Sequence, residues 1–408
     1  MKRFFHLFSR DSLHISSVFT ILWGFVLRFK RNIAVFGYYG AGNLGDDVIL
    51  YAIVKRLSRF IDKSRIVVVS SQLNANLQFI RLRYGVEAVS LRDPLGFLKV
   101  LFSSKVLVLG GGGILQPGFT IFSIFLYSLL FKLSGCKVVL LSVGVEFPHS
   151  FSLIDKFLVR LLVGISDVVT VRDLVSRAFL NSLAVSKPIL VFRDLSYLIY
   201  NDLSRFRSNF EFNGGGDPYV ILVLKDISSN VMPLMGEHLD LHYLVNVLSD
   251  FCNYLIDVRG VKVYFLIAQH GLKSDLNIAL KVLKNVNNLS MVHVAFYGSM
   301  PFNKLLDLLR GSICVISMRL HPLILASMMG KPVIGLSYSN KVKTFMYEND
   351  LGSFLIDLTR PYDSHSFKLI FQRILNDSES FTYNYVEGYY HEVLSKASIV
   401  ESFLEQNI

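Results

Sequence analysis

Two basic side chains, Arg319 and His321, follow an apolar run of the sequence and stand at the start of a segment with helical spacing. The run at 314–317 is typical of a buried strand, Pro322 fits the first turn of a helix, and Gly330 ends that helix. Buried parallel strands deliver their carboxyl ends to a ligand crevice, where helix N-termini attract anions. The pattern therefore predicts an anion site; the alternative is a satisfied core histidine beside a surface arginine.

Further polar residues stand where other predicted strands end, namely Arg172, Gln269, His270 and Lys341. Guanidinium and ammonium groups at such positions suit phosphate or carboxylate ligands. We therefore predict that these four residues bind substrate. For Arg172, a simple ion pair with the neighbouring Asp173 is the alternative.

A glycine-rich turn, GAGNLG at 40–45, matches the pattern of dinucleotide-binding turns. The second predicted strand ends in SSQ, without the acidic residue that would bind a ribose, so NAD is disfavoured. The turn still allows a ligand to approach Gly42 and Asn43 closely. Asp46 and Asp47, at the start of the next helix, either cap that helix or accept a proton from a substrate hydroxyl.

Four consecutive glycines follow another predicted strand. Gly111, Gly112 and Gly113 permit backbone conformations that other residues avoid, which favours an anion-binding nest or close approach of a ligand. A tight turn inside the domain is the alternative interpretation.

Composition limits the class of protein. Of the 408 residues, 52% are hydrophobic and 18% charged, which supports buried cores in about two domains. Lysine and arginine number 42 against 31 acidic residues, a net charge of +11 that favours anionic partners. No nucleic-acid-binding motif is present in the sequence, so nucleic acid is not an expected partner. Three isolated cysteines in apolar surroundings indicate a reduced, cytoplasmic protein without a metal site.

Short apolar runs alternate with segments of helical spacing, which predicts parallel sheets covered by helices on both faces. The glycine-rich stretch 213–218 reads as a linker, after which the alternation restarts. We therefore predict an α/β fold with two doubly wound Rossmann-like domains, at 32–212 and 219–408, that face a cleft. The predicted strands are at 33–36, 66–69, 106–109, 138–142, 168–171, 189–192, 219–224, 261–268, 291–295, 314–317 and 333–336.

Two segments concern membranes. Residues 1–31 combine basic side chains with Phe4, Phe5 and an apolar run too short to span a bilayer. We interpret this segment as a basic amphipathic helix on an anionic membrane surface, with a helix that caps the core as the alternative. For the apolar segment 119–133, a buried or membrane-touching helix is favoured over a span. The expected location is the cytoplasm, peripheral on the inner face of the cytoplasmic membrane.

Several motifs follow one another in a set order: GYYGAGNLGDD at 37–47, GGGGILQ at 110–116, VRD at 171–173, QH at 269–270 with Asp275, and RLH at 319–321 through GLSYSNK at 335–341. In this order they resemble the motifs of the polysaccharide pyruvyl transferase family. The resemblance covers about 33–347. The sequence departs from the family pattern at GVEFP, 144–148, and at FRD, 192–194, which bears on the acceptor more than on the donor.

The resemblance implies a fold similar to that of GT-B glycosyltransferases. It also implies transfer of a pyruvyl group from phosphoenolpyruvate, without a cofactor or metal, to two sugar hydroxyls of a polysaccharide or its lipid-linked precursor. The product is a cyclic ketal of an exopolysaccharide or cell-envelope glycan. Under this hypothesis Arg319 and Arg172 bind phosphate and carboxylate, and His321 donates a proton to the methylene carbon and later accepts one from a hydroxyl. Asp46 or Asp47 helps to deprotonate the acceptor.

Two other functions stay open. A glycosyltransferase of the same architecture would use the arginine and histidine groups on the diphosphate of a nucleotide sugar. A non-catalytic scaffold for glycan assembly at a membrane would show no turnover.

Overall fold

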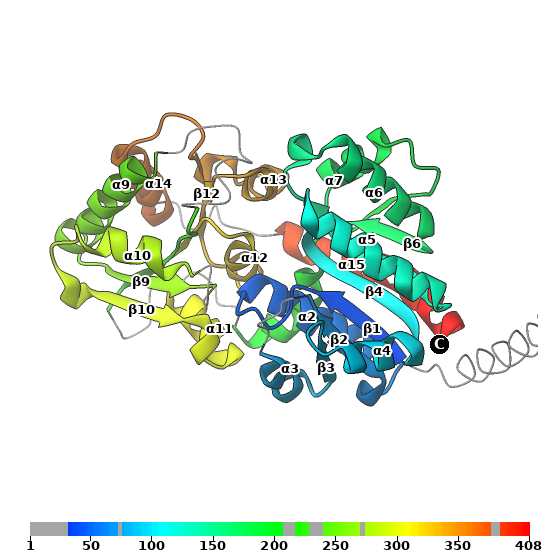
Figure 1. Ribbon diagram of the computed structural model, residues 1–408. Coiled ribbons are helices and arrows are strands. Elements are labelled where there is room, and N and C mark those ends of the chain that lie inside the picture. The colour runs from blue at the N-terminus through cyan, green and yellow to red at the C-terminus, as the bar shows by residue number, and fades with distance from the viewer. Residues whose placement is uncertain (1–31, 72–75, 207–216, 228–239, 270–273, 377–383) are drawn as a thin grey trace, which may run out of the picture.

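The computed structural model describes the chain at 32–71, 76–206, 217–227, 240–269, 274–376 and 384–408. The predicted segment 1–31, most of the predicted linker and the predicted site residue His270 lie outside these described residues. The described chain forms two α/β halves, each built on its own parallel sheet (Figure 1).

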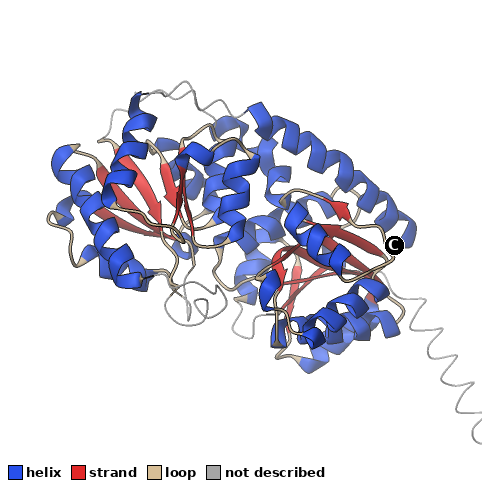
Figure 2. Cartoon of the chain, turned by 90° about the horizontal axis from the view of Figure 1, so that it is seen from above, coloured by secondary structure: helices blue, strands red, loops and turns tan. Residues whose placement is uncertain are grey.

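The N-terminal sheet has the strand order β3-β2-β1-β4-β5-β6-β7, with every pair parallel. Its central strands are apolar and buried, because helices cover both faces (Figure 2). The predicted strands of this half are confirmed, and β3, which begins with an exposed glutamate, was not predicted. The strands are β1 (Asn32–Gly37), β2 (Ile66–Ser70), β3 (Glu87–Ser90), β4 (Ser104–Leu115), β5 (Lys137–Val145), β6 (Val168–Val171) and β7 (Leu190–Val191).

The C-terminal sheet has the order β10-β9-β8-β11-β12-β13 and is also parallel. The predicted strands are again confirmed. The strand β13 was missed because it ends in Asp357 and contains one β-branched residue, so it forms no apolar run. The strands are β8 (Tyr219–Val223), β9 (Lys262–Ile267), β10 (Val292–Phe296), β11 (Val315–Ser317), β12 (Val333–Ser337) and β13 (Leu355–Asp357).

Helices of the N-terminal half form two layers. One apolar cluster joins α4 to α7 to one face of the sheet, and another joins α2, α3 and η3 to the opposite face. The helices are α2 (Leu44–Leu57), α3 (Leu77–Tyr84), α4 (Pro94–Ser103), α5 (Phe119–Leu133), α6 (Leu153–Ile165) and α7 (Leu174–Ser182), with the 3₁₀ segments η1 (Lys63–Arg65), η2 (Pro148–Ser150) and η3 (Leu195–Phe206).

The remaining helices follow in the C-terminal part of the chain, and all but the last, α15, cover the C-terminal sheet in the same way. They are α9 (Leu241–Asn253), α10 (Leu276–Leu283), α11 (Phe302–Gly311), α12 (Leu320–Met328), α13 (Asn340–Glu348), α14 (Ser364–Asn376) and α15 (Asn384–Asn407), with the π segment η4 (Tyr254–Val258) and the 3₁₀ segments η5 (Leu289–Met291), η6 (Tyr297–Ser299) and η7 (Gly352–Phe354).

The last helix, α15, crosses to the N-terminal half. It packs on η3 and β4, and Arg56 of α2 bonds to Glu401 of α15 at 2.6 and 2.5 Å. Figure 1 shows α15 beneath α5, beside the N-terminal sheet. The predicted range 219–408 followed sequence order, whereas α15 buries its apolar side against the other half.

Helix starts are fixed by side-chain caps. Asn43 caps α2, Asp93 caps α4 and Asp173 caps α7, each accepting a bond from a backbone N–H of the first turn. In parallel α/β units each such helix begins at the edge where the preceding strand ends. Turns, caps and site candidates therefore share one edge of the sheet.

Two sequence expectations about helices need comment. The helix near His321 begins at Leu320, so His321 lies inside its first turn and not ahead of it, because Arg319 is the last extended residue. The segment 119–133 is α5, which buries one side and exposes the other. Within the described residues, no helix is both long and apolar enough to cross a membrane.

Candidate functional site

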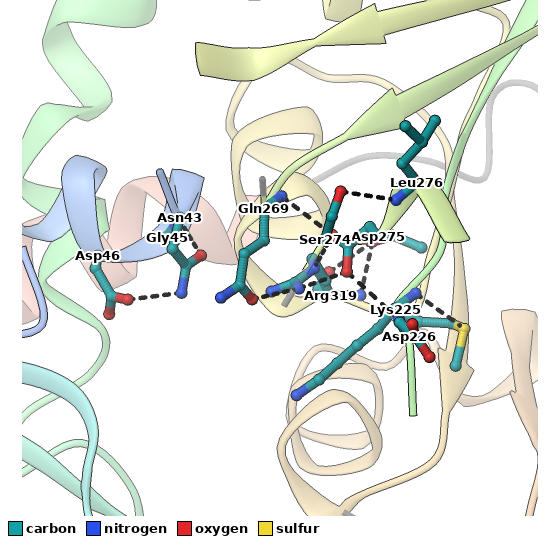
Figure 3. Close-up of polar contacts among 12 residues, drawn as sticks. Asn43, Gly45, Asp46, Lys225, Asp226, Gln269, Ser274, Asp275, Leu276 and Arg319 are labelled. Atoms are coloured by element: carbon teal, nitrogen blue, oxygen red, sulfur yellow. Dashed lines mark hydrogen bonds and ion pairs between the residues drawn. The ribbon is translucent and has the colours of Figure 1, made fainter. Parts of the chain in front are cut away.

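The glycine-rich turn of the N-terminal half touches a strand end of the C-terminal half. Asn43 forms an isolated bridge with Gln269, and the backbone N–H of Leu44 donates to the carbonyl of Ala268 at 2.9 Å. Gly42, with φ 69°, gives the turn a left-handed step before Asn43. Figure 3 shows Asn43 and Asp46 on one side of this junction, with Gln269 and Arg319 on the other. The carboxyl edges of the two sheets therefore meet here.

His321 of α12 reaches across to the N-terminal half with both ring nitrogens. Its Nε2 lies 3.3 Å from Oδ2 of Asp194, and both side chains are largely buried. Its Nδ1 faces Gly45 so closely that a Cβ built on Gly45 would lie 2.1 Å from it. The ring is thus held between an aspartate and a bare stretch of backbone.

Asp194, which follows β7, was not among the predicted site residues. Its Oδ1 accepts bonds from the N–H and the hydroxyl of Ser196 at 3.0 and 2.7 Å. Burial alone would raise the pKa of Asp194, but His321, Arg172 and the Ser196 backbone together hold it well below its usual range. Asp194 is therefore an ionised partner for His321. The FRD motif at 192–194 was the available signal, since Asp194 follows a strand end.

Arg319 is bound within its own half. Its Nε and Nη2 donate to the two carboxylate oxygens of Asp275, each at 2.7 Å, and Nη2 also donates to Oε1 of Gln269 at 2.7 Å. Burial raises the pKa of Asp275 although Arg319 opposes this. The Arg319 guanidinium was predicted to bind an anion. Its Nε and Nη2 edge is instead bonded to Asp275 and Gln269 (Figure 3).

Asp46, in the first turn of α2, is the acidic group that faces His321, Lys341 and Arg319. Its Oδ2 accepts a bond from Asn43 Nδ2 at 2.6 Å. Burial raises the pKa of Asp46 to about 6, although these three cationic groups oppose the shift. A carboxyl group with this pKa can exchange a proton near neutral pH.

Asp47 points elsewhere. Its side chain is buried, and Oδ2 accepts a bond from the hydroxyl of Tyr297 at 3.1 Å, from the other half of the molecule. Burial raises the pKa of Asp47 to about 7. The structure therefore places Asp47 in the packing between the halves, where Arg83 is its main cationic neighbour, and Asp46 beside His321.

The glycine run lies inside β4 and not, as the sequence predicted, in a turn after a strand, and it makes room for side chains of the site. A Cβ on Gly113 would lie 1.9 Å from Oε1 of Glu146, and one on Gly111 would lie 2.7 Å from Ile49. Gly112 has φ 81°, in the left-handed region, and passes close to Asp46. The run therefore packs closely at three of its four glycines, since a Cβ on Gly110 would also lie 2.3 Å from the hydroxyl of Tyr39.

Glu146 and Lys341 form an ion pair across the cleft, with Nζ 3.0 Å from Oε1. Burial would raise the pKa of Glu146, but Lys341, Arg172 and Lys225 hold it below its usual value. The pair places Lys341, from the start of α13, beside the N-terminal sheet. Sequence reasoning missed Glu146, which stands where β5 ends in the turn GVEFP.

Arg172 is buried at the end of β6. Its Nε donates to Asp173 at 3.2 Å, the ion pair expected as an alternative, and its Nη2 reaches to the backbone at Gly144. Burial by itself would lower the pKa of Arg172, but the neighbouring carboxylates of Asp173, Asp194 and Glu146 raise it. A pocket between the halves is lined by Arg172, Asp194 and Lys341, among others.

Two further residues of the C-terminal half were missed. Lys225 follows β8, and its Nζ lies 5.1 Å from the ring centroid of buried Tyr338. Burial opposes ionisation of the phenol, but Lys341 and Lys225 hold the pKa of Tyr338 below its usual range. Both residues follow predicted strands closely, and this position was the sequence signal that could have identified them as site residues.

The structure thus brings together most of the predicted residues: His321, Asp46, Asn43, Arg319, Gln269, Arg172, Lys341 and the glycines at 111–113. Within the described residues no group of three or more His, Cys, Asp or Glu side chains is arranged to hold a metal ion. The roles of the site residues stay predictions.

Comparison with solved structures identifies the architecture. Similar structures include UDP-GlcNAc 2-epimerase from Neisseria meningitidis, with 14% identity and TM-score 0.58, covering 91% of this chain and 99% of that chain. A putative UDP-N-acetylglucosamine 2-epimerase from Listeria monocytogenes has 13% identity and TM-score 0.61, with 93% and 98% covered. HepE from Anabaena, in complex with UDP and glucose, has 14% identity and TM-score 0.58, with 92% and 99% covered. These likenesses show the fold, which is of the GT-B type.

Comparison by sequence identifies the family. A search of curated proteins found no significant match. The family model for polysaccharide pyruvyl transferases matches residues 43–340, a range that contains Asp46, Asp194 and His321. Because this match spans most of the chain and both halves of the cleft, the chain belongs to the polysaccharide pyruvyl transferase family.

Proposed function

We propose that this protein is an enzyme that transfers the pyruvyl group of phosphoenolpyruvate to two hydroxyls of a sugar, in a polysaccharide or its lipid-linked precursor. In this reaction the methylene carbon gains a proton, two C–O bonds to the sugar form, and the C–O bond to phosphate breaks. The products are a cyclic ketal and inorganic phosphate. Of the two hydroxyl protons, one balances the proton taken up by the new methyl group and the other leaves with phosphate.

The observation that carries the proposal is the arrangement around His321. The Asp194 carboxylate at Nε2 favours a proton on that nitrogen, which leaves Nδ1 to exchange a proton. Gly45 packs so closely on Nδ1 that any side chain there would collide with the ring, so this contact holds the imidazole in place. We assign to Nδ1 the proton transfer to the methylene carbon and the later uptake of a hydroxyl proton.

Donor binding follows from charge. Phosphoenolpyruvate is a small trianion, and Arg172, Lys225, Arg319 and Lys341 all lie around the junction of the two halves. Asp275 occupies the Nε and Nη2 edge of the Arg319 guanidinium. We therefore assign to Arg319 the attraction of the donor by its positive charge and by a hydrogen bond from Nη1. No cofactor besides the donor is part of this proposal.

Asp46 supplies the second proton-transfer group in this mechanism. Its pKa of about 6 makes it mostly ionised at neutral pH, so it can take a proton from an acceptor hydroxyl and release it again. Asp47 has no such role in the mechanism, because its carboxylate is bonded to Tyr297 inside the packing.

The test is incubation of the protein with phosphoenolpyruvate and a panel of free and lipid-linked glycans, with inorganic phosphate and the ketal methyl group as readouts. Release of phosphate coupled to ketal formation supports the proposal. A parallel incubation with nucleotide sugars should release no nucleoside diphosphate.

A nucleotide-sugar glycosyltransferase is the second candidate. It is favoured by the structures of similar fold that hold UDP or UDP-GlcNAc, among them HepE with UDP and glucose. Nucleoside diphosphate release in the same incubation would identify it. A scaffold without catalysis would release neither product.

We further propose a location at the inner face of the cytoplasmic membrane, where lipid-linked glycan precursors are accessible. The basic and aromatic residues of the segment 1–31 support this attachment through charge and apolar contact. The segment lies outside the described residues, so its support comes from sequence.

A further inference from the structure

Five strongly exposed apolar side chains of the N-terminal half share one position in their helices. Each is the first or second residue of a helix, and each is between 60% and 84% exposed. We name this set the apolar rim: Leu95, Phe119, Leu153, Ile154 and Leu174.

The apolar rim lies at the same sheet edge as the candidate site. The helices α4 to α7 begin where β3 to β6 end. The last part of β4 contains Gly113, and Glu146 and Arg172 directly follow β5 and β6. Only one residue, Asp173, separates Arg172 from rim residue Leu174. The rim therefore borders the N-terminal side of the cleft.

The helices that carry the rim form a continuous layer. Phe97 of α4 contacts Tyr127 of α5 with ring centroids 5.4 Å apart, and α5 packs on α6 (Figure 1). Phe151, just before α6, contacts Phe179 of α7 at 4.8 Å. Further exposed apolar residues, Phe122 and Phe157, extend the surface along α5 and α6. Soluble proteins seldom expose such neighbouring apolar side chains unless the surface binds a partner.

Charge around the rim is positive. Arg92, Lys99, Arg160 and Arg177 are exposed on the same four helices or the turns before them. The acidic side chains between 91 and 182 are engaged in caps or ion pairs, namely Asp93, Asp155 and Asp173 in helix caps, Glu146 with Lys341, and Asp167 with Lys132. The surface therefore combines apolar side chains with positive charge.

We propose that the apolar rim and its basic neighbours bind an anionic phospholipid bilayer. Apolar tips that enter the headgroup region and basic side chains beside them are the combination that such a surface favours. A second copy of the chain fits less well, since a two-fold contact would bring the same positive charges together. If the proposed function holds, the bilayer also places lipid-linked acceptors at the cleft.

The test is co-sedimentation of the full-length protein with vesicles of phosphatidylcholine alone or with phosphatidylglycerol. The rim variant carries Phe119→Ser, Leu153→Ser and Ile154→Ser. The matched control carries Val258→Ser, Leu280→Ser and Leu289→Ser, exposed apolar positions of the C-terminal half. We expect the rim variant to bind anionic vesicles at least tenfold more weakly and the control to change by less than about twofold.

A charge variant with Arg160→Glu and Arg177→Glu separates apolar from ionic contributions and leaves the core untouched. It should also weaken binding to anionic vesicles, and added salt should weaken wild-type binding. Thermal midpoints show whether each variant is folded. These readouts do not depend on pyruvyl transfer, so they distinguish failure of this proposal from failure of the proposed function.

Three results would overturn the proposal. One is no binding of the wild type to anionic vesicles. Another is equal binding by the wild type and both variants, which would leave the segment 1–31 as the attachment. The third is self-association that the rim variant abolishes while vesicle binding is unchanged, which would assign the rim to a second copy.

Discussion

The two halves of the cleft contribute opposite charges. The N-terminal half supplies the carboxylates Asp46, Glu146 and Asp194, whereas the C-terminal half supplies Lys225, Arg319, His321 and Lys341. Arg172 and Asp275 are the exceptions, and each is held by a partner of its own half.

This division has a physical consequence. Glu146 with Lys341 and Asp194 with His321 are contacts between halves, so the site neutralises itself only when the halves are docked. An incoming trianion must compete with these carboxylates for the cations. The carboxylates of the N-terminal half therefore weaken the positive charge of the site, and the cations of the C-terminal half attract the donor. Four substitutions test this division, from the largest expected effect to the smallest.

The largest effect is expected from His321→Ala, on the C-terminal side. Loss of the proton carrier should lower kcat for pyruvyl transfer by about 100-fold or more, while the protein stays folded. Phosphate release under saturating donor measures this. The control is His293→Ala, an exposed position on β10. Near-normal kcat in His321→Ala would remove His321 from the mechanism.

Gly45→Ala tests the same contact from the N-terminal side. The added Cβ would lie 2.1 Å from His321 Nδ1, so the ring or the turn must move, and kcat should fall by about tenfold or more. Gly164→Ala is the matched control, because nothing lies within 4 Å of its Cβ. If both glycine variants behave alike, Nδ1 is not the working nitrogen.

Arg319→Lys keeps the charge on the C-terminal side and removes the planar fork. It loses the paired bonds to Asp275, so the apparent KM for phosphoenolpyruvate should rise by about tenfold, with a smaller change in kcat. Arg310→Lys, an exposed position on α11, serves as the control. An unchanged KM would show that the fork has no part in donor binding.

The smallest effect concerns stability and pH. The pKa of Asp46 is about 6 in the folded protein, against about 3.9 for a free aspartate, so the folded state binds more protons between these values. The contribution of Asp46 to stability therefore falls as pH rises from about 4 to about 6.

Asp46→Asn should remove this penalty. The free energy of unfolding should rise by about 3 kcal/mol at pH 7.5 and change little at pH 4, as measured by urea denaturation at both pH values. Asp93→Asn, at an exposed cap, should show no such difference between the two pH values. A gain that is equal at pH 4 and pH 7.5 would mean that burial of the Asp46 charge is not the cause.

Much of the fold was predictable because its signals are local. Runs of buried β-branched residues identify strands such as β2 and β11 within a few positions, and caps such as Asp173 follow directly. The strands β3 and β13 escaped because each contains one β-branched residue, Val89 or Ile356, together with an acidic residue, so neither forms an apolar run.

The sequence by itself determined two doubly wound halves and basic residues at strand ends, among them Arg172 and Arg319. Only the tertiary structure decided which partners those residues meet. Asp194 joins His321 and Glu146 joins Lys341, 195 positions away, because the two sheets dock edge to edge. It also decided that α15 returns to the N-terminal half, where its apolar side is buried. Contacts between distant residues depend on that docking, which no local pattern of residues encodes.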